Sequence, residues 1–386
     1  MRSLLFALAL AACNPVPVQP DASLSNDAGG GSDAGQDPGE IATTIRVHYP
    51  AGARSILLRG SGGPLNWNTG VAFTSGADDT WTYSTTEIVT ETEWKPLLDD
   101  TTWSRGPNYR VRPGETVDAY PRFNTVKGWF EKRWPAFHSN TLNNDRDIWV
   151  YYPASYFENT RAHYPVVYMH DGQNVFDPTL AFSGNEWGVD EAFDDAAESG
   201  AFKEALVVAV TNTANRLWEY TPTRDSNVGA GGGADQYLTM LVSELKPRVD
   251  NELRTLAGRE TTVLIGSSLG GLVSAYAGTK HPAVFGLIGE LSPSTWWDNQ
   301  VIIGLVTTAN NRMPRPLRVY IDSGDSGPSS DDMANTAQLA QTYVTGGYQS
   351  GVDLLHVIQA GATHHETYWA QRFPGAMRFL LGPRTP

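Results

Sequence analysis

From about residue 126 onward, this 386-residue chain alternates short apolar runs with longer amphipathic segments, and that alternation restricts its fold more than any other feature. The apolar runs are residues 146–152, 165–169, 205–211, 261–266, 284–291, 317–322 and 354–358, and the amphipathic segments are residues 234–255, 269–280, 332–345 and 366–381. Several runs are apolar on both faces, as strands are when helices cover both sides of a parallel sheet. Strands that alternate with helices in this way form layered α/β folds. We therefore predict an α/β domain over residues 126–386.

One predicted junction between a strand and a helix carries a catalytic motif. Residues 266–270 read Gly-Ser-Ser-Leu-Gly, and they join the apolar run 261–266 to the helical segment 269–280. A G-x-S-x-G pattern in this context is typical of a nucleophile elbow, a tight turn that presents the serine at the N-terminus of the helix. The motif predicts Ser268 as the nucleophile, because Ser267 lies one position too early.

A serine nucleophile needs a general base, and with this elbow the histidine follows both the serine and the acid along the chain. Four histidines follow Ser268. His281 lies at a helix end and has surface character, and His356 lies inside a predicted strand. His364 and His365 lie between the last strand and the last helix, where the base is expected. Position alone leaves these two open.

The acid of the triad is expected after the strand 317–322. Three aspartates are candidates there, namely Asp322, Asp325 and Asp331. Asp325 comes directly after the strand and is our first choice, while Asp331 and Asp322 stay as alternatives. Such a carboxylate holds the imidazole in the productive tautomer and stabilises the imidazolium. A Ser–His dyad without a strong acid is also compatible with the sequence.

An oxyanion hole requires two backbone N–H groups, one of which belongs to the residue after the nucleophile. That residue is Leu269, and the second donor should come from the loop after the strand 165–169. The loop begins His170-Asp171-Gly172-Gln173, and its glycine lets the backbone turn toward a substrate oxygen. We predict that Gln173 supplies the second N–H and that His170 and Asp171 brace the loop.

Five segments of this domain together resemble one known family. They are YMHDGQNVFD (168–177), WGVD (187–190), NRLWEYTP (215–222), GSSLGGL (266–272) and HHETYW (364–369). The segments resemble the putative-esterase family, which includes enterobactin esterases, S-formylglutathione hydrolases, and feruloyl or acetyl xylan esterases. The resemblance implies an α/β-hydrolase fold, hydrolysis of carboxylic esters and no cofactor.

The same resemblance bears on individual residues. The family's C-terminal motif places the base at His364, with Glu366 and Trp369 in register. Arg216 and Glu219 match a family segment near the active site. We expect these two residues to form a structural ion pair, with contact to substrate as the alternative.

Residues 41–125 have a different character, because apolar and polar residues alternate there in short runs separated by glycine- and proline-rich turns. Short strands at this spacing predict a small all-β sandwich. The segments LNW (65–67), EWK (93–95) and WSRGPNY (103–109) resemble starch-binding carbohydrate modules, which implies a glucan platform of Trp67, Lys95 and Trp103. Alternatively the tryptophans fill the core, and the domain is structural or shapes the substrate site. The β-sandwich that precedes the catalytic domain of enterobactin-type esterases supports this alternative.

The first forty residues resemble a bacterial lipoprotein N-terminus. Arg2 precedes a nine-residue apolar stretch, and the only cysteine of the chain, Cys13, follows Leu-Ala-Ala. We expect residues 1–12 to be a signal peptide and Cys13 to be lipidated; an ordinary signal peptide with an incidental cysteine is the alternative. Residues 13–40 are rich in Pro, Gly, Ser and Asp, which predicts a disordered tether.

Composition excludes several classes of protein. Forty-two acidic residues against 28 Lys and Arg give a net charge of −14, which disfavours binding to nucleic acid. A single cysteine excludes an internal disulfide, and no cluster has the spacing of metal ligands. The sequence thus predicts an exported, lipid-anchored serine esterase that acts on a small-molecule or carbohydrate-linked ester. The alternatives are an acyltransferase to a sugar or lipid alcohol, and a glucan-binding surface protein with an inactive hydrolase scaffold.

Overall fold

The computed structural model describes residues 41–383. Its N-terminal part consists of two sheets, one with the strand order β4-β5-β1-β9 and one with the order β3-β2-β6-β7, to which β8 adds by pairing with β6. The strands are β1 (Thr43–His48), β2 (Ile56–Gly60), β3 (Val71–Ala72), β4 (Thr74–Ser75), β5 (Thr80–Thr85), β6 (Thr92–Leu98), β7 (Thr102–Trp103), β8 (Tyr109–Val111) and β9 (Thr116–Ala119). Alternate residues of β1, such as Ile45 and Val47, are fully buried, as in a strand with one face on a core. This confirms the predicted all-β sandwich.

The larger sheet has eight strands in the order β10-β11-β13-β12-β16-β17-β18-β19. Its strands are β10 (Trp129–Ser139), β11 (Asn144–Tyr152), β12 (Val166–His170), β13 (Leu206–Val210), β16 (Thr262–Ser267), β17 (Leu287–Leu291), β18 (Arg318–Gly324) and β19 (Leu354–Gln359). β11 is antiparallel to both of its neighbours, and the pairs from β13 to β19 are all parallel. The predicted α/β-hydrolase fold is confirmed.

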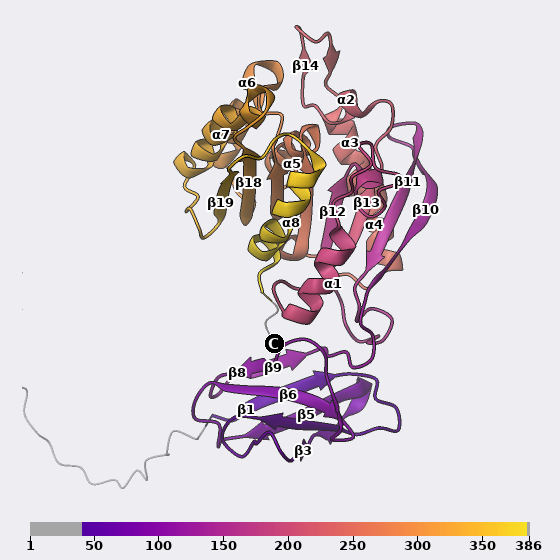
Figure 1. The fold of residues 1–386 in the computed structure, drawn as a ribbon, viewed down its shortest axis with the longest axis vertical. Helices are drawn as coiled ribbons and strands as arrows, with labels where there is room; N and C mark the ends of the chain where they lie inside the picture. Colours follow the sequence, from indigo (N-terminus) through magenta and orange to yellow (C-terminus); the bar gives the residue numbers. More distant parts are fainter. Residues whose placement is uncertain (1–40, 384–386) are drawn as a thin grey trace, which may run out of the picture. The chain divides into compact units, whose positions relative to one another are not determined.

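Helices cover both faces of this sheet. The helices are α1 (Val189–Ser199), α2 (Arg216–Glu219), α3 (Ala234–Met240), α4 (Lys246–Glu252), α5 (Leu269–Lys280), α6 (Trp297–Asn310), α7 (Met333–Thr345) and α8 (Glu366–Leu381). In β12, Val167 and Met169 face a core that includes α1 and α8, whereas Val166 and Tyr168 face a core that includes α3 to α7. Figure 1 shows α1 and α8 in front of the sheet. The strands are therefore buried on both faces, which explains their continuous apolar sequences.

The strand order determines where chemistry can occur. In open α/β sheets, ligands bind beyond the carboxyl ends of the parallel strands. Here those ends are His170, Ser267, Leu291 and Gly324, on strands that are neighbours in the sheet. The motifs found in the sequence thus meet at one edge.

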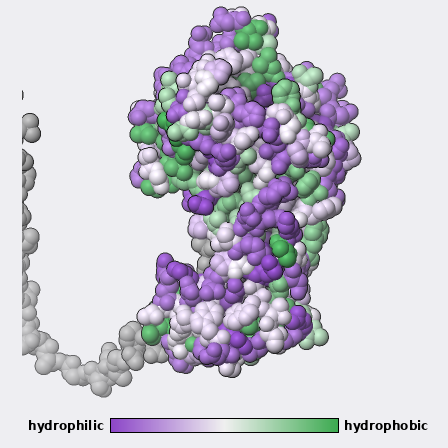
Figure 2. All heavy atoms as spheres, in the orientation of Figure 1, coloured by the Kyte–Doolittle hydropathy of each residue, from purple (hydrophilic) through white to green (hydrophobic). Residues whose placement is uncertain are grey.

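The surface and the helices add two observations. Hydrophilic and hydrophobic residues are interspersed over the face drawn in Figure 2. Among the helices of residues 41–383, none has both the length and the apolar character that a bilayer span requires.

Candidate active site

Ser268 lies in a strained turn between β16 and α5. Its φ of 57° and ψ of −121° are unusual for a residue with a side chain, and its N–H donates to the Leu291 carbonyl at 3.0 Å. A Cβ atom on Gly266 would lie 2.8 Å from His170 Cδ2, and one on Gly270 would lie 3.3 Å from His170 Cβ. Glycine is therefore required at Gly266, and the turn has the geometry of a nucleophile elbow.

Next to this turn, His364 forms a short hydrogen bond with a buried carboxylate. His364 Nδ1 lies 2.6 Å from Oδ1 of Asp331, whose exposed fraction is 2%. His365, in contrast, accepts a hydrogen bond from the N–H of Thr367 and caps α8. The register suggested by the family motif thus selects the histidine that is hydrogen-bonded to a buried carboxylate, whereas His365 lies only 3.9 Å from Glu366.

The structure places Asp325, our first choice of acid, away from the histidine. Asp325 does not contact the histidine; its Oδ1 accepts hydrogen bonds from the Ser326 hydroxyl and from the N–H of Gly361, at 2.9 and 2.7 Å. Asp322 is buried beside Arg372, at 2.9 Å, and burial raises its pKa to about 6, although Arg372 opposes the shift. Asp331, an alternative in our sequence analysis, is the carboxylate at His364.

Asp331 reaches the histidine because the chain folds back after β18. It lies in a short 3-10 segment, Pro328–Asp332, and its Oδ2 accepts the N–H of Gly324 at 2.5 Å and the Ser292 hydroxyl at 2.7 Å. Burial by itself would raise the pKa of Asp331, but the hydrogen bonds from His364, Ser292 and Gly324 outweigh burial and lower it. The carboxylate is consequently ionised at neutral pH and can accept the Nδ1 proton of His364.

Two backbone N–H groups next to Ser268 are available to an oxyanion. Leu269 is the first residue of α5, and Gln173 lies in the 3-10 turn Gly172–Asn174 directly after β12. Neither N–H donates a hydrogen bond to another of the described residues. A Cβ atom on Gly172 would lie 2.6 Å from the Ala209 carbonyl carbon, so only glycine lets this turn lie against β13.

These features agree with a comparison of the whole chain with protein families. The family model described as putative esterase matches residues 139–380, well over half of the chain. The chain belongs to the putative esterase family. It is an esterase of the α/β-hydrolase fold, preceded in the sequence by a β-sandwich.

Individual relatives of this esterase share between 26% and 35% of its residues over the matched segments. It is 26% identical over 249 residues to the uncharacterized protein YbbA of Bacillus subtilis, a match covering 62% of this chain and 93% of that protein. It is 35% identical over 121 residues to the siderophore enterobactin esterase of Emericella nidulans, covering 28% of this chain and 40% of that enzyme. It is 31% identical over 135 residues to the iron(III) salmochelin esterase of Escherichia coli, covering 34% of this chain and 29% of that enzyme.

Solved structures share the fold. The siderophore hydrolase EstA from Aspergillus nidulans superposes with a TM-score of 0.52 at 19% identity, covering 66% of this chain and 94% of that one. The IroE-like serine hydrolase from Shewanella oneidensis gives a TM-score of 0.51 at 20% identity, with coverages of 65% and 79%.

A cavity of about 630 Å³ in this esterase is lined by Ser268 and His364. Part of its wall is the segment after η2 (Gly172–Asn174), which contributes Leu180, 46% exposed, and Phe182, 90% exposed. The neighbouring Ser183 hydroxyl donates to Glu366 at 3.0 Å, which joins this wall to the first turn of α8. The cavity thus has an apolar side next to the elbow.

Among residues 41–383, Arg216 is the one Lys or Arg that lines this cavity, and it is already paired. Arg216 donates to both oxygens of Asp171, at 2.7 and 2.8 Å, and Asn212 donates to Asp171 Oδ1 at 2.6 Å. The expected Arg216–Glu219 pair was wrong, because fully buried Glu219 binds Arg146 through both carboxylate oxygens. Arg216 therefore braces the loop after β12 through Asp171, and it adds little net charge to the cavity.

His170 has the bracing position that we predicted. It is buried, and its Nδ1 lies 2.9 Å from the Tyr237 hydroxyl. Burial lowers the pKa of His170 to about 3 despite the adjacent Asp171. The ring is neutral under ordinary conditions and holds the end of β12 against α3.

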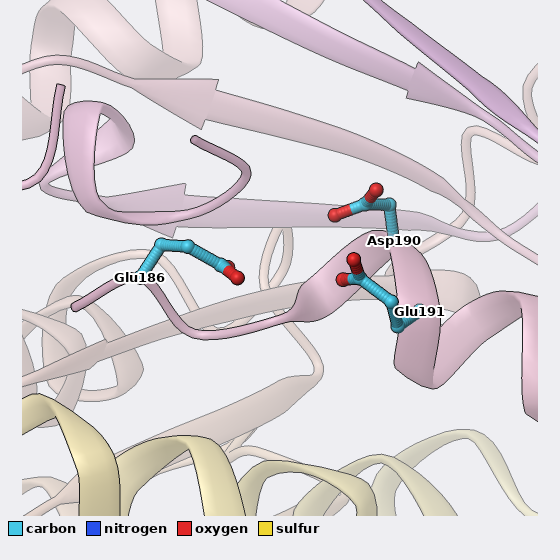
Figure 3. Close-up of side chains that lie close together, drawn as sticks. All are labelled: Glu186, Asp190 and Glu191. Carbon is cyan, nitrogen blue, oxygen red and sulfur yellow. The ribbon is translucent and has the colours of Figure 1, made fainter. Parts of the chain in front are cut away.

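Three carboxylates gather at the start of α1. Figure 3 shows the side chains of Glu186, Asp190 and Glu191 directed toward one another, and one oxygen of each lies within 4.8 Å of the others. Burial and the neighbouring Glu191 raise the pKa of Asp190 to about 7. Partly exposed carboxylates without a further indication of a ligand do not define a metal site, so we treat the cluster as a source of pH-dependent stability.

In the sandwich, the two tryptophans of the expected glucan platform lie close together. The rings of Trp67 and Trp103 are 6.0 Å apart with a 45° tilt, and Trp103 is 38% exposed. Lys95 donates to the Gly106 carbonyl at 2.6 Å. Trp94, in contrast, is fully buried and stacks on Tyr109 in the core.

The lipidation candidate Cys13, the signal peptide and the tether lie outside the described residues.

Proposed function

We propose that this esterase hydrolyses carboxylic esters through a triad of Ser268, His364 and Asp331 and an acyl-enzyme intermediate. The observation that carries the proposal is the 2.6 Å hydrogen bond between a buried carboxylate and His364, which lines the same cavity as the elbow serine. In this arrangement Asp331 accepts the Nδ1 proton, so Nε2 of His364 is left as the basic nitrogen.

The reaction proceeds in two halves. Ser268 Oγ attacks the ester carbonyl while His364 Nε2 takes its proton, and the tetrahedral intermediate collapses as the imidazolium protonates the leaving alcohol. Water then attacks the acyl-enzyme with His364 again as the base, which releases the acid and restores Ser268. The N–H groups of Leu269 and Gln173 would stabilise the oxyanion in both halves.

The Ser268 side chain must reorient for this chemistry. Its hydroxyl lies 3.3 Å from that of Ser294, and among residues 41–383 no hydrogen bond joins it to His364. Catalytic hydrogen bonds are often long or unformed without substrate and tighten in the complex. The movement we propose is rotation about the Ser268 Cα–Cβ bond, since both side chains line the same cavity.

The test is hydrolysis of p-nitrophenyl acetate by two matched variants. Ser268→Ala should lower kcat by a factor on the order of 10⁶, as loss of a serine nucleophile commonly does. Ser267→Ala removes the neighbouring hydroxyl and should stay within about tenfold of wild type, since Ser267 has no part in the triad. Substantial activity in folded Ser268→Ala would exclude the mechanism.

For the substrate, we propose an uncharged ester with an apolar or aromatic arm. Leu180 and Phe182 offer apolar surface to such an arm. Asp171 neutralises Arg216, so among residues 41–383 no unpaired Lys or Arg lines the cavity to attract a highly anionic ferric siderophore. A feruloyl ester should therefore be hydrolysed faster than a ferric catecholate ester. Feruloyl esters are the substrate type in the name of one relative, an endo-1,4-beta-xylanase/feruloyl esterase. The reverse preference in a side-by-side assay would refute this assignment.

The tryptophan pair, with Trp103 exposed and Trp67 partly buried, supports a second function, binding of a glucan by the sandwich. Flat indole faces suit the apolar faces of sugar rings, and Trp67 and Trp103 lie side by side with Trp103 exposed. The test is retardation of the full-length protein in starch gels. Trp103→Ala should abolish retardation, whereas Trp129→Ala, which removes a 53% exposed tryptophan of β10, should not. Wild-type migration unaffected by starch would exclude glucan binding.

We also propose that the protein is exported and anchored through a lipid on Cys13. The wild type should then partition with membranes, and Cys13→Ser should be released or stay unprocessed. Firm anchoring needs more than one acyl chain, which a lipoprotein cysteine carries. A wild-type protein found only in the soluble fraction would contradict the proposal.

A further inference from the structure

The hydroxyl of Ser292 lies at the centre of a buried network behind the triad acid. Ser292 directly follows β17, is fully buried and has a φ of 38°. Its Oγ lies 2.7 Å from Asp331 Oδ2, 3.0 Å from Trp369 Nε1 and 2.9 Å from Arg372 Nη2. Its N–H also donates to the Asp322 side chain.

The chemistry of these groups fixes the direction of each hydrogen bond. An indole N–H and a guanidinium can only donate. Ser292 Oγ must therefore accept from Trp369 and Arg372, and its single proton goes to Asp331 Oδ2. Gly324 donates its N–H to the same oxygen. With Oδ2 occupied by two donors, Oδ1 is left to face His364.

Arg372 is itself held firmly, on α8 two turns after the histidine loop. Its side chain is 4% exposed, its Nε forms an ion pair with Asp322 at 2.9 Å, and its Nη1 donates to Gln359 at 3.0 Å. Its Nη2 lies 3.9 Å from Asp331 Oδ2, so the cation also lies beside the triad acid. Burial of a charged guanidinium destabilises the fold unless its N–H groups all have acceptors, so Arg372 depends on Asp322, Gln359 and the Ser292 hydroxyl.

We propose that Ser292, oriented by Arg372, is the positioning residue that holds Asp331 with Oδ1 toward His364. The inference rests on the proposed triad and extends it to groups that touch no substrate. Without the Ser292 hydroxyl, Asp331 Oδ2 would keep one hydrogen bond, from the Gly324 N–H, and the more distant Arg372 cation, so the carboxylate could rotate away from the imidazole. Trp369 and Arg372 would each lose an acceptor.

A matched pair of variants tests this role. Ser292→Ala and Ser323→Ala each remove one fully buried hydroxyl, but the Ser323 hydroxyl has no partner among the described residues. Ser292→Ala should lower kcat about 10- to 100-fold, the effect of losing a hydrogen bond to a charged group. KM should change less than about threefold because Ser292 does not line the cavity. Ser323→Ala should leave both constants near wild type.

A spectroscopic measurement separates this inference from the proposed function. The proton between His364 and Asp331 should give a downfield imidazole resonance in the free enzyme, which requires no turnover. We expect Ser292→Ala to shift or broaden this resonance and Ser323→Ala to preserve it. If the wild type hydrolyses no ester, the proposed function fails, and the resonance still tests the positioning role.

A third variant keeps the inference testable if Ser292→Ala does not fold. Arg372→Lys retains a cation for Asp322 but loses the planar donor to Ser292. It should lower kcat several-fold with KM unchanged and alter the same resonance. Suppose that Arg372→Lys, and Ser292→Ala if it folds, have the same kcat and the same imidazole resonance as Ser323→Ala. Ser292 then has no positioning role.

Discussion

The sharpest test of the proposed triad is the pair Asp331→Asn and Asp325→Asn. Both oxygens of Asp331 accept hydrogen bonds, from the Gly324 N–H and from His364, and an asparagine amide has only one oxygen to accept them. The Gly324 N–H donates to Asp331 Oδ2, so an asparagine must place its carbonyl oxygen there. Its NH2 group then points at Nδ1 of His364, where Asp331 Oδ1 now lies at 2.6 Å. Nδ1 becomes an acceptor, and the imidazole proton moves to Nε2.

That tautomer cannot accept a proton from Ser268, so the base is lost. The same substitution in a serine protease lowers turnover about 10⁴-fold, which sets the upper end of the expected effect. A lower bound comes from the lost charge: a carboxylate and an imidazolium about 4 Å apart interact by about 4 kcal/mol at an effective dielectric constant of 20. At ~1.4 kcal/mol per factor of ten, this corresponds to about 10³.

The assay is steady-state hydrolysis of p-nitrophenyl acetate near pH 8, with a thermal melt of each variant to verify folding. We expect Asp331→Asn to lose about 10³- to 10⁴-fold in kcat. Asp325→Asn should stay within about tenfold of wild type, because among residues 41–383 the Asp325 side chain accepts hydrogen bonds from Ser326 and Gly361 and not from His364. A folded Asp331→Asn enzyme with near-wild-type kcat, or an equal loss in Asp325→Asn, would refute the assignment.

Three further predictions concern other positions. His364→Ala should be about as damaging as loss of Ser268, while His365→Ala should stay within about tenfold, as kcat measurements will show. Because the pKa of Asp190 is raised to about 7, its protonated form stabilises the fold below about pH 4, and this stability is lost as pH rises through 7. Asp190→Asn should therefore raise the melting temperature at pH 8 but not at pH 4; no difference between the two pH values would contradict the shift. Phe182→Ala should raise KM for a feruloyl ester more than for p-nitrophenyl acetate, since only the larger substrate reaches the cavity wall at Phe182. Equal changes in the two KM values would show that the feruloyl group binds elsewhere.

The sequence predicted the strands of the larger sheet with one exception, at one of its two edges. Every predicted strand exists, including the other edge strand β19, because these strands have largely continuous apolar sequences. The edge strand β10 was not predicted, since its sequence contains Pro135 and several charged residues and most of its side chains are not buried. α6 was also missed, because Val301, Ile302 and Ile303 favour strands and only packing against the sheet makes this segment helical.

Within the site, the sequence predicted the position of a side chain where local geometry decides it. The elbow needs glycine beside Ser268, and the family motif needs His364 in one register, so both were identified from the sequence. The acid depends on a chain reversal in which Gly327 and Asp331 have positive φ values, and no local pattern predicts that reversal. The partner of Arg216 was missed for a related reason, since Asp171 is 45 residues away in the chain.

The buried network explains how an acid several residues after β18 can still be positioned accurately. Asp331 Oδ2 is fixed by the N–H of Gly324, at the end of β18, and by the hydroxyl of Ser292, at the end of β17. These strands are neighbours in the sheet, so the position of the carboxylate is set by two strand ends rather than by the loop that carries it. Arg372 then connects the same point to the helix that follows His364. Loop length can therefore vary without moving the acid, provided that the donors at the strand ends are kept.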